Sequence, residues 1–206
     1  GIIFSNGKYE IADMVFDCAD DFNLFLKSWD FDERIICDFV EQHEYSEKIF
    51  SGSTNTIRVI TVMNHETDKA YVVHAMHRFG TEKSKPVDNI SSGGLCCLID
   101  VDSGMLGKLS SVALLGESFN YHPDSKATVV GTKVPNWEKI KETVIHVHNC
   151  FPYYEFLAWD IVLDKNGDVF ALEINRGSDL NSQIICPLRN EPIGKWMREK
   201  NLLKNF

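Results

Sequence analysis

Two apolar segments joined by a polar turn form the clearest pattern in the chain. Residues 56–63 and 70–79 are rich in Val, Ile, Ala and Met, and residues 64–69 between them are polar. Runs of β-branched residues bounded by Asn and Asp are typical of strands. The pattern therefore predicts an antiparallel hairpin.

A second hairpin is predicted near the C-terminus. Residues 155–163 form the outgoing apolar strand, the sequence DKNG at 164–167 is a turn signal, and residues 168–175 return. Polar residues interrupt both strands. In the first strand, Asp160 lies in the middle of the apolar run. In the second strand, Glu173 and Asn175 are two residues apart and therefore share a face.

Shorter elements surround these hairpins. The chain opens with a predicted strand at residues 1–4 and a turn at Asn6-Gly7. Asp20-Asp21 can cap an amphipathic helix that carries Phe22, Leu24, Phe25 and Leu26, and a buried strand is predicted at 34–41. A strand at 94–101 is followed by irregular structure to residue 130. The pattern then predicts a helix capped by Asn136, with Trp137, Ile140, Val144 and Val147 at helical spacing, and a surface helix at 193–206. Together these elements indicate one compact unit of the α+β class.

Composition limits the classes of function. With 44% apolar and 25% charged residues the chain is globular in character, and its net charge of −9 with 21 scattered basic residues argues against a nucleic-acid partner. We therefore expect a small ligand. The apolar runs fall far short of the roughly 20 residues that cross a bilayer, and no leader opens the sequence. We expect a cytoplasmic protein without membrane insertion, and the sequence gives no indication of its oligomeric state.

Cysteine and histidine spacings predict no metal centre. The six cysteines lack CxxC spacing, which favours reduced, packed thiols. His146 and His148 are two residues apart on a predicted helix, so their side chains diverge, whereas paired helical ligands need i, i+4 spacing.

Oxygen donors of the second hairpin are the first candidate site. Asp160, Glu173 and Asn175 offer two carboxylates and an amide oxygen, which is a ligand set suited to Mg²⁺. The alternative is that Asp160 bonds a turn while Glu173 and Asn175 are solvated on an edge strand.

Basic and glycine residues of the first hairpin and of the loop after it are the second candidate site. Arg58 and Arg78 interrupt the apolar strands, and guanidinium groups bind phosphate oxygens in a bidentate manner. In the following loop Asn89 offers an amide, and Gly93 and Gly94 allow backbone N–H groups to approach an anion. The alternatives are ordinary edge arginines and a plain Gly-Gly turn.

The order of these motifs resembles the ATP-grasp superfamily, and most closely the sugar-transfer-associated ATP-grasp family. The resemblance runs from about residue 35 to residue 183 through STNTIR, Arg78, VDNISSGG, HPDS, VPNW and WDIVLDKNGDVFALEIN. The chain is similar, more loosely, to ATP-grasp ligases that add glutamate to a carboxyl terminus. The resemblance implies an ATP-grasp fold in which residues 1–50 are a remnant of the central subdomain with the adenine hinge. Residues 51–206 would form the C-terminal catalytic subdomain, an antiparallel sheet flanked by helices.

Residue roles follow from the same resemblance. It implies ATP and two Mg²⁺ ions, with Asp160, Glu173 and Asn175 as metal ligands. Arg58 and Arg78 would lie near the transferred phosphoryl group, and Asn89 would face the phosphates. The nucleotide-binding positions that it implies are Ile36, Asp38, Phe39, Val40 and Glu41 of the hinge, with Gly93 and Gly94 of the loop.

Two departures from the family pattern affect these expectations. The lysines that grip the α- and β-phosphates would lie upstream of Gly1, so we expect weak nucleotide binding by this chain. Residues 176–179, Arg-Gly-Ser-Asp, differ from the Pro-Gly continuation of the glutamate-adding ligases.

The function that the resemblance implies is ligation of a small-molecule carboxylate to an amine through an acyl phosphate. Family context associates the substrates with sugars and with cell-surface polysaccharide assembly. Two alternatives stay open at this point. One is an ATP-grasp kinase acting on a hydroxyl with His122 as its general base, and the other is a nucleotide-binding domain without turnover.

Overall fold

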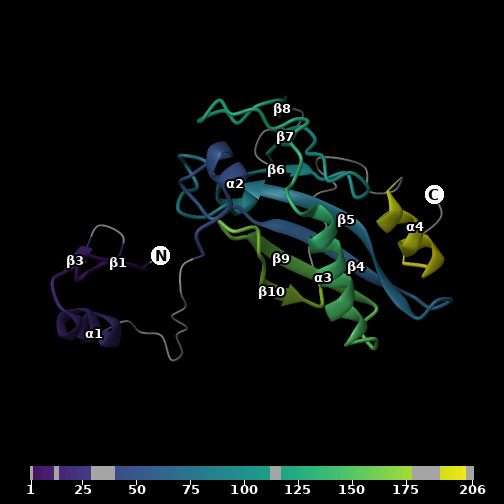
Figure 1. Ribbon diagram of the computed structural model, residues 1–206, viewed down its shortest axis with the longest axis horizontal. Helices are drawn as coiled ribbons and strands as arrows, with labels where there is room; N and C mark the ends of the chain where they lie inside the picture. The colour runs from purple at the N-terminus through teal and green to yellow at the C-terminus, as the bar shows by residue number, and fades with distance from the viewer. Residues whose placement is uncertain (1, 12–13, 29–39, 112–116, 178–190, 203–206) are drawn as a thin grey trace. The chain divides into compact units, whose positions relative to one another are not determined.

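The structure is a computed structural model of the 206-residue chain, and it describes residues 2–11, 14–28, 40–111, 117–177 and 191–202. The chain divides into two compact units, Gly1–Phe39 and Val40–Phe206 (Figure 1). The expectation of a single compact unit is therefore wrong. The N-terminal unit is separate because its apolar side chains pack on one another in a small core of their own.

In the described residues of the N-terminal unit, three short antiparallel strands precede a helix. Their bounds are β1 (Ile2–Ser5), β2 (Lys8–Ile11), β3 (Met14–Phe16) and α1 (Ala19–Ser28). The predicted turn joins β1 to β2, and both Asn6 and Gly7 have positive φ. The ring of Tyr9 stacks on Phe22 with 4.6 Å between centroids. Because α1 begins at Ala19, the two aspartates lie in its first turn, where they favour the helix dipole, and do not cap it.

The described part of the larger unit is built on a seven-stranded antiparallel sheet. The order of its strands is β10-β9-β4-β5-β6-β7-β8. Their bounds are β4 (Ile57–Asn64), β5 (Lys69–Phe79), β6 (Leu95–Leu98), β7 (Leu109–Ser110), β8 (Ser118–Phe119), β9 (Phe156–Leu163) and β10 (Val169–Asn175). Both predicted hairpins are confirmed, and they lie side by side because β9 also pairs with β4.

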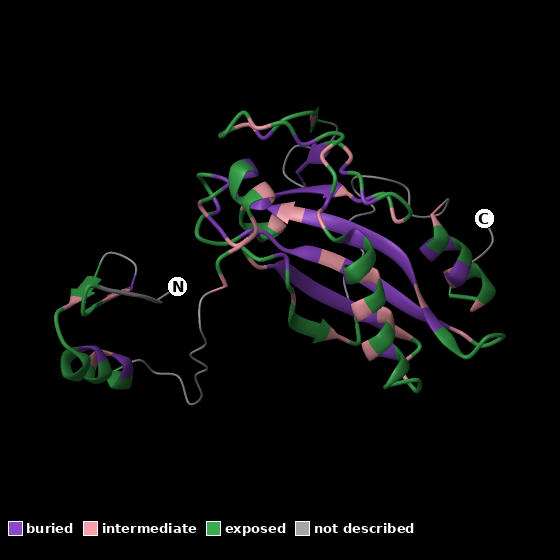
Figure 2. Ribbon diagram, viewed as in Figure 1, coloured by how far each residue is buried: buried purple, intermediate pink, exposed green. Residues whose placement is uncertain are grey.

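Helices cover both faces of this sheet. Their bounds are α2 (Glu44–Ile49), the 3-10 turn η1 (Ile90–Ser92), α3 (Trp137–Asn149) and α4 (Pro192–Glu199). Ile140 of α3 packs in one core with Val59, whereas Ile193 of α4 packs in another with Ile60. Successive strand residues point to opposite faces, so α3 and α4 pack on opposite faces of the sheet. Figure 2 shows that the central strands are largely buried. No helix in the described ranges is long and apolar enough to cross a membrane.

Several local predictions differ from the structure. Helix α2 lies in a segment for which no helix was predicted, and the predicted strand at 94–101 is shorter, since β6 ends at Leu98. Asn136 stands at the N-cap of α3 but makes no capping bond; its side chain donates to the carbonyl of Gly167 at 3.0 Å. The predicted strand at 34–41 lies outside the described residues except for Val40 and Glu41, neither of which is in a strand.

A buried histidine joins α2 to the sheet. The Tyr45 hydroxyl lies 2.7 Å from His77 Nε2, and His77 Nδ1 lies 3.0 Å from the Arg78 carbonyl. Because a carbonyl only accepts, Nδ1 carries the proton and Nε2 accepts from Tyr45. The ring also stacks on Phe79 at 4.1 Å. Burial lowers the pKa of His77 to about 3, so the folded protein keeps this ring neutral.

We predict that acid destabilises the larger unit through His77. The unfolded chain binds a proton near pH 6.5, whereas the folded ring does not until about pH 3. The contribution is therefore complete above pH 6.5 and is lost as the pH falls toward 3, at up to about 1.4 kcal/mol per pH unit. Urea unfolding at pH 7 and pH 5 should show a smaller difference for His77→Gln than for the wild type. The same change at the exposed His146 is the control, and an equal difference in all three proteins would contradict the prediction.

Candidate active site

A buried ion pair joins the two hairpins. Arg58 of β4 stands directly opposite Asp160 of β9 in the strand register. Arg58 Nε donates to Asp160 Oδ1 at 2.5 Å and Nη2 donates to Oδ2 at 3.1 Å. The side chains are only 14% and 9% exposed, respectively. This is a bidentate pair, the strong form of the arginine–carboxylate interaction.

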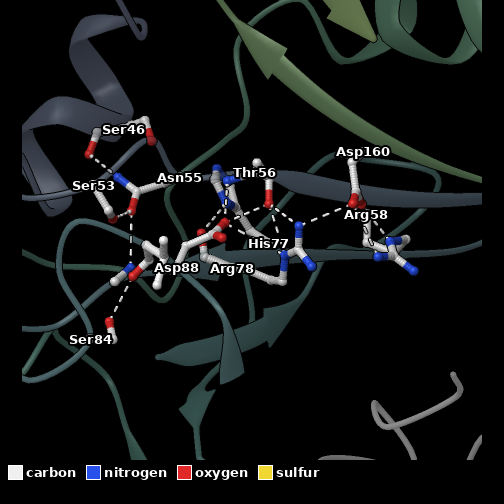
Figure 3. Close-up of polar contacts among 12 residues, drawn as sticks. Ser46, Ser53, Asn55, Thr56, Arg58, His77, Arg78, Ser84, Asp88 and Asp160 are labelled. Atoms are coloured by element: carbon white, nitrogen blue, oxygen red, sulfur yellow. Dashed lines mark hydrogen bonds and ion pairs between the residues drawn. The ribbon is translucent and has the colours of Figure 1, made fainter. Parts of the chain in front are cut away.

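A second guanidinium group reaches the same carboxylate. Arg78 lies on β5, the other neighbour of β4, and its Nη2 is 3.2 Å from Asp160 Oδ2. Figure 3 shows Asp160 beside both arginine heads. We call Arg58, Asp160 and Arg78 the Arg-Asp-Arg cluster. Two guanidinium groups thus share one carboxylate, and guanidinium groups can also bind the oxygens of an anionic ligand.

Thr56 and Asp88, which lie outside the predicted site, complete the network. Thr56 donates to Asp88 Oδ2 through its backbone N–H at 2.8 Å and through its hydroxyl at 2.5 Å. Arg78 in turn donates to the Thr56 hydroxyl through Nε and Nη2 at 2.8 and 2.5 Å, and its Nε lies 3.5 Å from Asp88 Oδ2. Their positions in the sequence could have indicated this role, because Thr56 stands two residues before Arg58 and Asp88 directly precedes Asn89.

The predicted metal ligands of β10 share a face with the cluster. Glu173 stands opposite Asp160 and Asn175 opposite Ala158, and directly opposed residues point to the same side of a sheet. A bulge at Leu172 makes this possible, because the register shifts between Ala171 and Glu173. Without the extra residue, Leu172 would oppose Asp160. Asn175 ends the strand, where it also borders a pocket of about 410 Å³.

The oxygen donors suit magnesium in kind, but Asp160 is already engaged. Two carboxylates and one amide on one face are hard ligands of the type that Mg²⁺ takes. Both carboxylate oxygens of Asp160 accept from arginine, so a cation there competes with guanidinium groups. Among the described residues, no three His, Cys, Asp or Glu side chains gather as a metal site.

The glycine loop is closed by its own hydrogen bonds. Asn89 is exposed, and its side chain does not cap η1. Its carbonyl accepts from the N–H of Gly94 at 3.0 Å, while the Gly93 N–H donates to Ile90 at 3.1 Å. A Cβ on Gly94 would lie 2.4 Å from the carbonyl oxygen of Asp88. The missing side chain therefore lets the loop return against Asp88, and an anion at these N–H groups would compete with the turn.

The predicted adenine hinge is only partly described. Ile36, Asp38 and Phe39 lie outside the described residues. Glu41 pairs with Lys165, whose Nζ donates to the carboxylate and whose N–H donates to the carbonyl, both at 2.8 Å. Val40 precedes this contact. The described part of the hinge segment therefore lies against the turn between β9 and β10.

His122 is placed as a structural residue. Its ring is fully buried and stacks on Phe50 at 4.9 Å. Nε2 lies 2.8 Å from the Gly80 carbonyl, and Nδ1 accepts from the N–H of Asp124 at 3.3 Å. Burial lowers the pKa of this ring. With both nitrogens engaged inside the protein, His122 offers no accessible base for proton transfer.

We predict that Asp160 and Glu173 differ sharply in their effect on stability, although they are directly opposed. Asp160→Ala leaves two largely buried guanidinium groups without this carboxylate and should lower the free energy of unfolding by about 3 kcal/mol. Glu173 is exposed, so Glu173→Ala should change it by less than about 0.5 kcal/mol. Urea denaturation of the two variants measures both values. Equal losses would show that the cluster does not stabilise the sheet.

The comparison with known families agrees with this arrangement. A family model described as sugar-transfer associated ATP-grasp matches residues 18–188, which include every residue of the Arg-Asp-Arg cluster and both predicted ligands of β10. No curated protein gives a match to the chain. The family match extends over most of the 206 residues. The chain therefore belongs to the sugar-transfer associated ATP-grasp family.

Proposed function

We propose that this protein is an ATP- and magnesium-dependent carboxylate–amine ligase that works through an acyl phosphate. Family membership supports an ATP-dependent enzyme linked to sugar transfer. The observation that carries the proposal is the Arg-Asp-Arg cluster, which shares one sheet face with Glu173 and Asn175. Positive groups for phosphate oxygens and oxygen donors for a cation are both required by phosphoryl transfer.

The chain's own residues would then have two tasks. Arg58 and Arg78 would bind the oxygens of the transferred phosphoryl group and stabilise its charge, which fixed guanidinium groups do at no cost of reorganisation during reaction. Asp160, Glu173 and Asn175 would hold the metal ions. Two bound Mg²⁺ ions would neutralise the β- and γ-phosphates. Asn89 would face the phosphates from its loop, and Gly93 and Gly94 of the same loop would contribute to nucleotide binding.

The proposed reaction has two steps. A carboxylate oxygen of the first substrate attacks the γ-phosphorus and ADP leaves, which gives an acyl phosphate. The nitrogen of an amine then attacks the carbonyl carbon, inorganic phosphate leaves, and the nitrogen loses a proton to form the amide. We propose small-molecule substrates linked to sugars in the cytoplasm, with neither a nucleic acid nor a membrane segment involved. The assignment of residues 1–50 to a central subdomain with the adenine hinge also stays a proposal.

The kinase alternative loses the general base that was predicted for it, His122. A hydroxyl acceptor needs a residue that removes its proton, and the buried, doubly hydrogen-bonded His122 does not supply one. A domain that binds ATP without turnover would use the same cluster.

We predict that nucleotide binding depends on magnesium through Glu173. Glu173→Gln keeps the size of the side chain but removes its charge and should raise the Kd for ATP with Mg²⁺ at least about tenfold, the weight of a charge-assisted contact. Calorimetry with and without Mg²⁺ measures this effect. The same change at the exposed Glu66, in the turn between β4 and β5, is the matched control. Binding that survives both Glu173→Gln and removal of Mg²⁺ would refute the metal assignment.

We predict that turnover gives a trappable acyl phosphate. With a panel of carboxylates and hydroxylamine as a general amine nucleophile, ADP release should be accompanied by hydroxamate. Arg58→Ala should lower this rate at least about 100-fold, as expected for loss of a group that stabilises transition-state charge, while circular dichroism shows a retained fold. ADP release without hydroxamate would favour a kinase, and magnesium-dependent binding without ADP release on any carboxylate would favour a binding domain.

A further inference from the structure

The guanidinium group of Arg78 has two sets of anionic or polar partners. On one side its Nη2 contacts Asp160 at 3.2 Å. On the other, Nε and Nη2 donate to the Thr56 hydroxyl, and Nε lies 3.5 Å from Asp88 Oδ2. Figure 3 shows Arg78 between Asp88 and Asp160. Arg78 is therefore held by contacts that do not pass through Asp160.

Asp88 is itself firmly placed. It is buried, and its Oδ2 accepts both the N–H and the hydroxyl of Thr56. Its carbonyl lies where a Cβ on Gly94 would clash at 2.4 Å, so the glycine allows the loop to return at this point. Asp88 thus links the Asn89 loop to the start of β4. A carboxylate with this many fixed partners can orient Arg78 without moving.

Asp160 faces a conflict that Asp88 does not. Its two oxygens accept from Arg58, and Oδ2 also lies 3.2 Å from Arg78 Nη2 in this structure. If Asp160 binds a cation, as the proposed function requires, it gives up part of that attraction. A guanidinium group that is only 14% exposed is then left with less compensation, which is costly unless another anion remains beside it. Asp88 is the anion that remains.

We propose, on the basis of the proposed function, that Asp88 and Thr56 are positioning residues that keep Arg78 aligned with the transferred phosphoryl group while Asp160 binds metal. The two arginines are then not equivalent. Arg58 forms the bidentate pair with Asp160, whereas Arg78 is oriented by Asp88, which directly precedes Asn89. The aspartate of VDNISSGG contributes to catalysis through Arg78 and does not touch the nucleotide.

The test uses the difference between ATP and ADP, because only ATP carries the γ-phosphate that Arg78 would contact. Titration calorimetry of the full chain with Mg²⁺ gives the Kd of each nucleotide. Asp88→Asn should raise the Kd for ATP about tenfold, the weight of one charge-assisted hydrogen bond. The Kd for ADP should change less than about twofold, because ADP lacks the γ-phosphate. A general loss of structure would instead weaken the binding of both nucleotides.

Two further variants keep the test decisive if Asp88→Asn folds poorly. Thr56→Val removes the hydroxyl at similar volume and should show the same selective loss for ATP. Thr56→Ser keeps the hydroxyl and should behave as the wild type. Asp168→Asn is the charge-matched control, because Asp168 is exposed and pairs with Lys139 at 2.8 Å.

The outcomes separate this inference from the proposed function. A wild type that prefers ATP over ADP, with the same preference in Asp88→Asn and Thr56→Val, would overturn the positioning role and leave the ligase proposal intact. Equal weakening of both nucleotides, or a Thr56→Ser variant as impaired as Thr56→Val, would also overturn it. A wild type without magnesium-dependent ATP binding would overturn both proposals.

Discussion

Charged groups in the middle of a sheet must be compensated, and this constraint organises the larger unit. Arg58, Arg78 and Asp160 lie on three adjacent central strands where water is largely excluded. Each remains charged at acceptable cost only because an opposite charge stands within hydrogen-bonding distance. The register that places Arg58 opposite Asp160 therefore serves the stability of the sheet and, under the proposed function, its chemistry.

The segment STNTIR contains both residues that stabilise the start of β4 and residues of the charge network. Asn55 fixes the entry to β4, because its amide donates to the Phe50 carbonyl at 2.6 Å and its oxygen accepts from the Gly80 N–H at 3.1 Å. Thr56 and Arg58, which follow, belong to the charge network. The hydrogen bonds of Asn55 and the charge network of Thr56 and Arg58 thus lie within one short segment.

The ion pairs of the cluster also indicate that the binding of nucleotide and metal would be coupled. Phosphate oxygens can take the place of Asp160 as partners of the arginines, and a cation can take the place of the arginines as partner of Asp160. Each replacement makes the other more favourable, because it leaves no buried charge without a partner. Nucleotide and metal would therefore bind together more readily than either would alone, a coupling that acts in both directions.

Local sequence determined the two hairpins, the class of the fold and the polar residues of the strands. Alternation, β-branched runs and the DKNG turn act over a few residues and need no distant partner, and the order of motifs was enough for the family. Tertiary structure alone decided the rest. Tyr45 of α2 bonds His77, Asp88 accepts from Thr56, which is 32 positions away, and Asn136 bonds Gly167 instead of capping its own helix. The bulge at Leu172 sets which face Glu173 occupies. These features arise from pairs brought together by folding, and spacing along the chain does not encode such pairs.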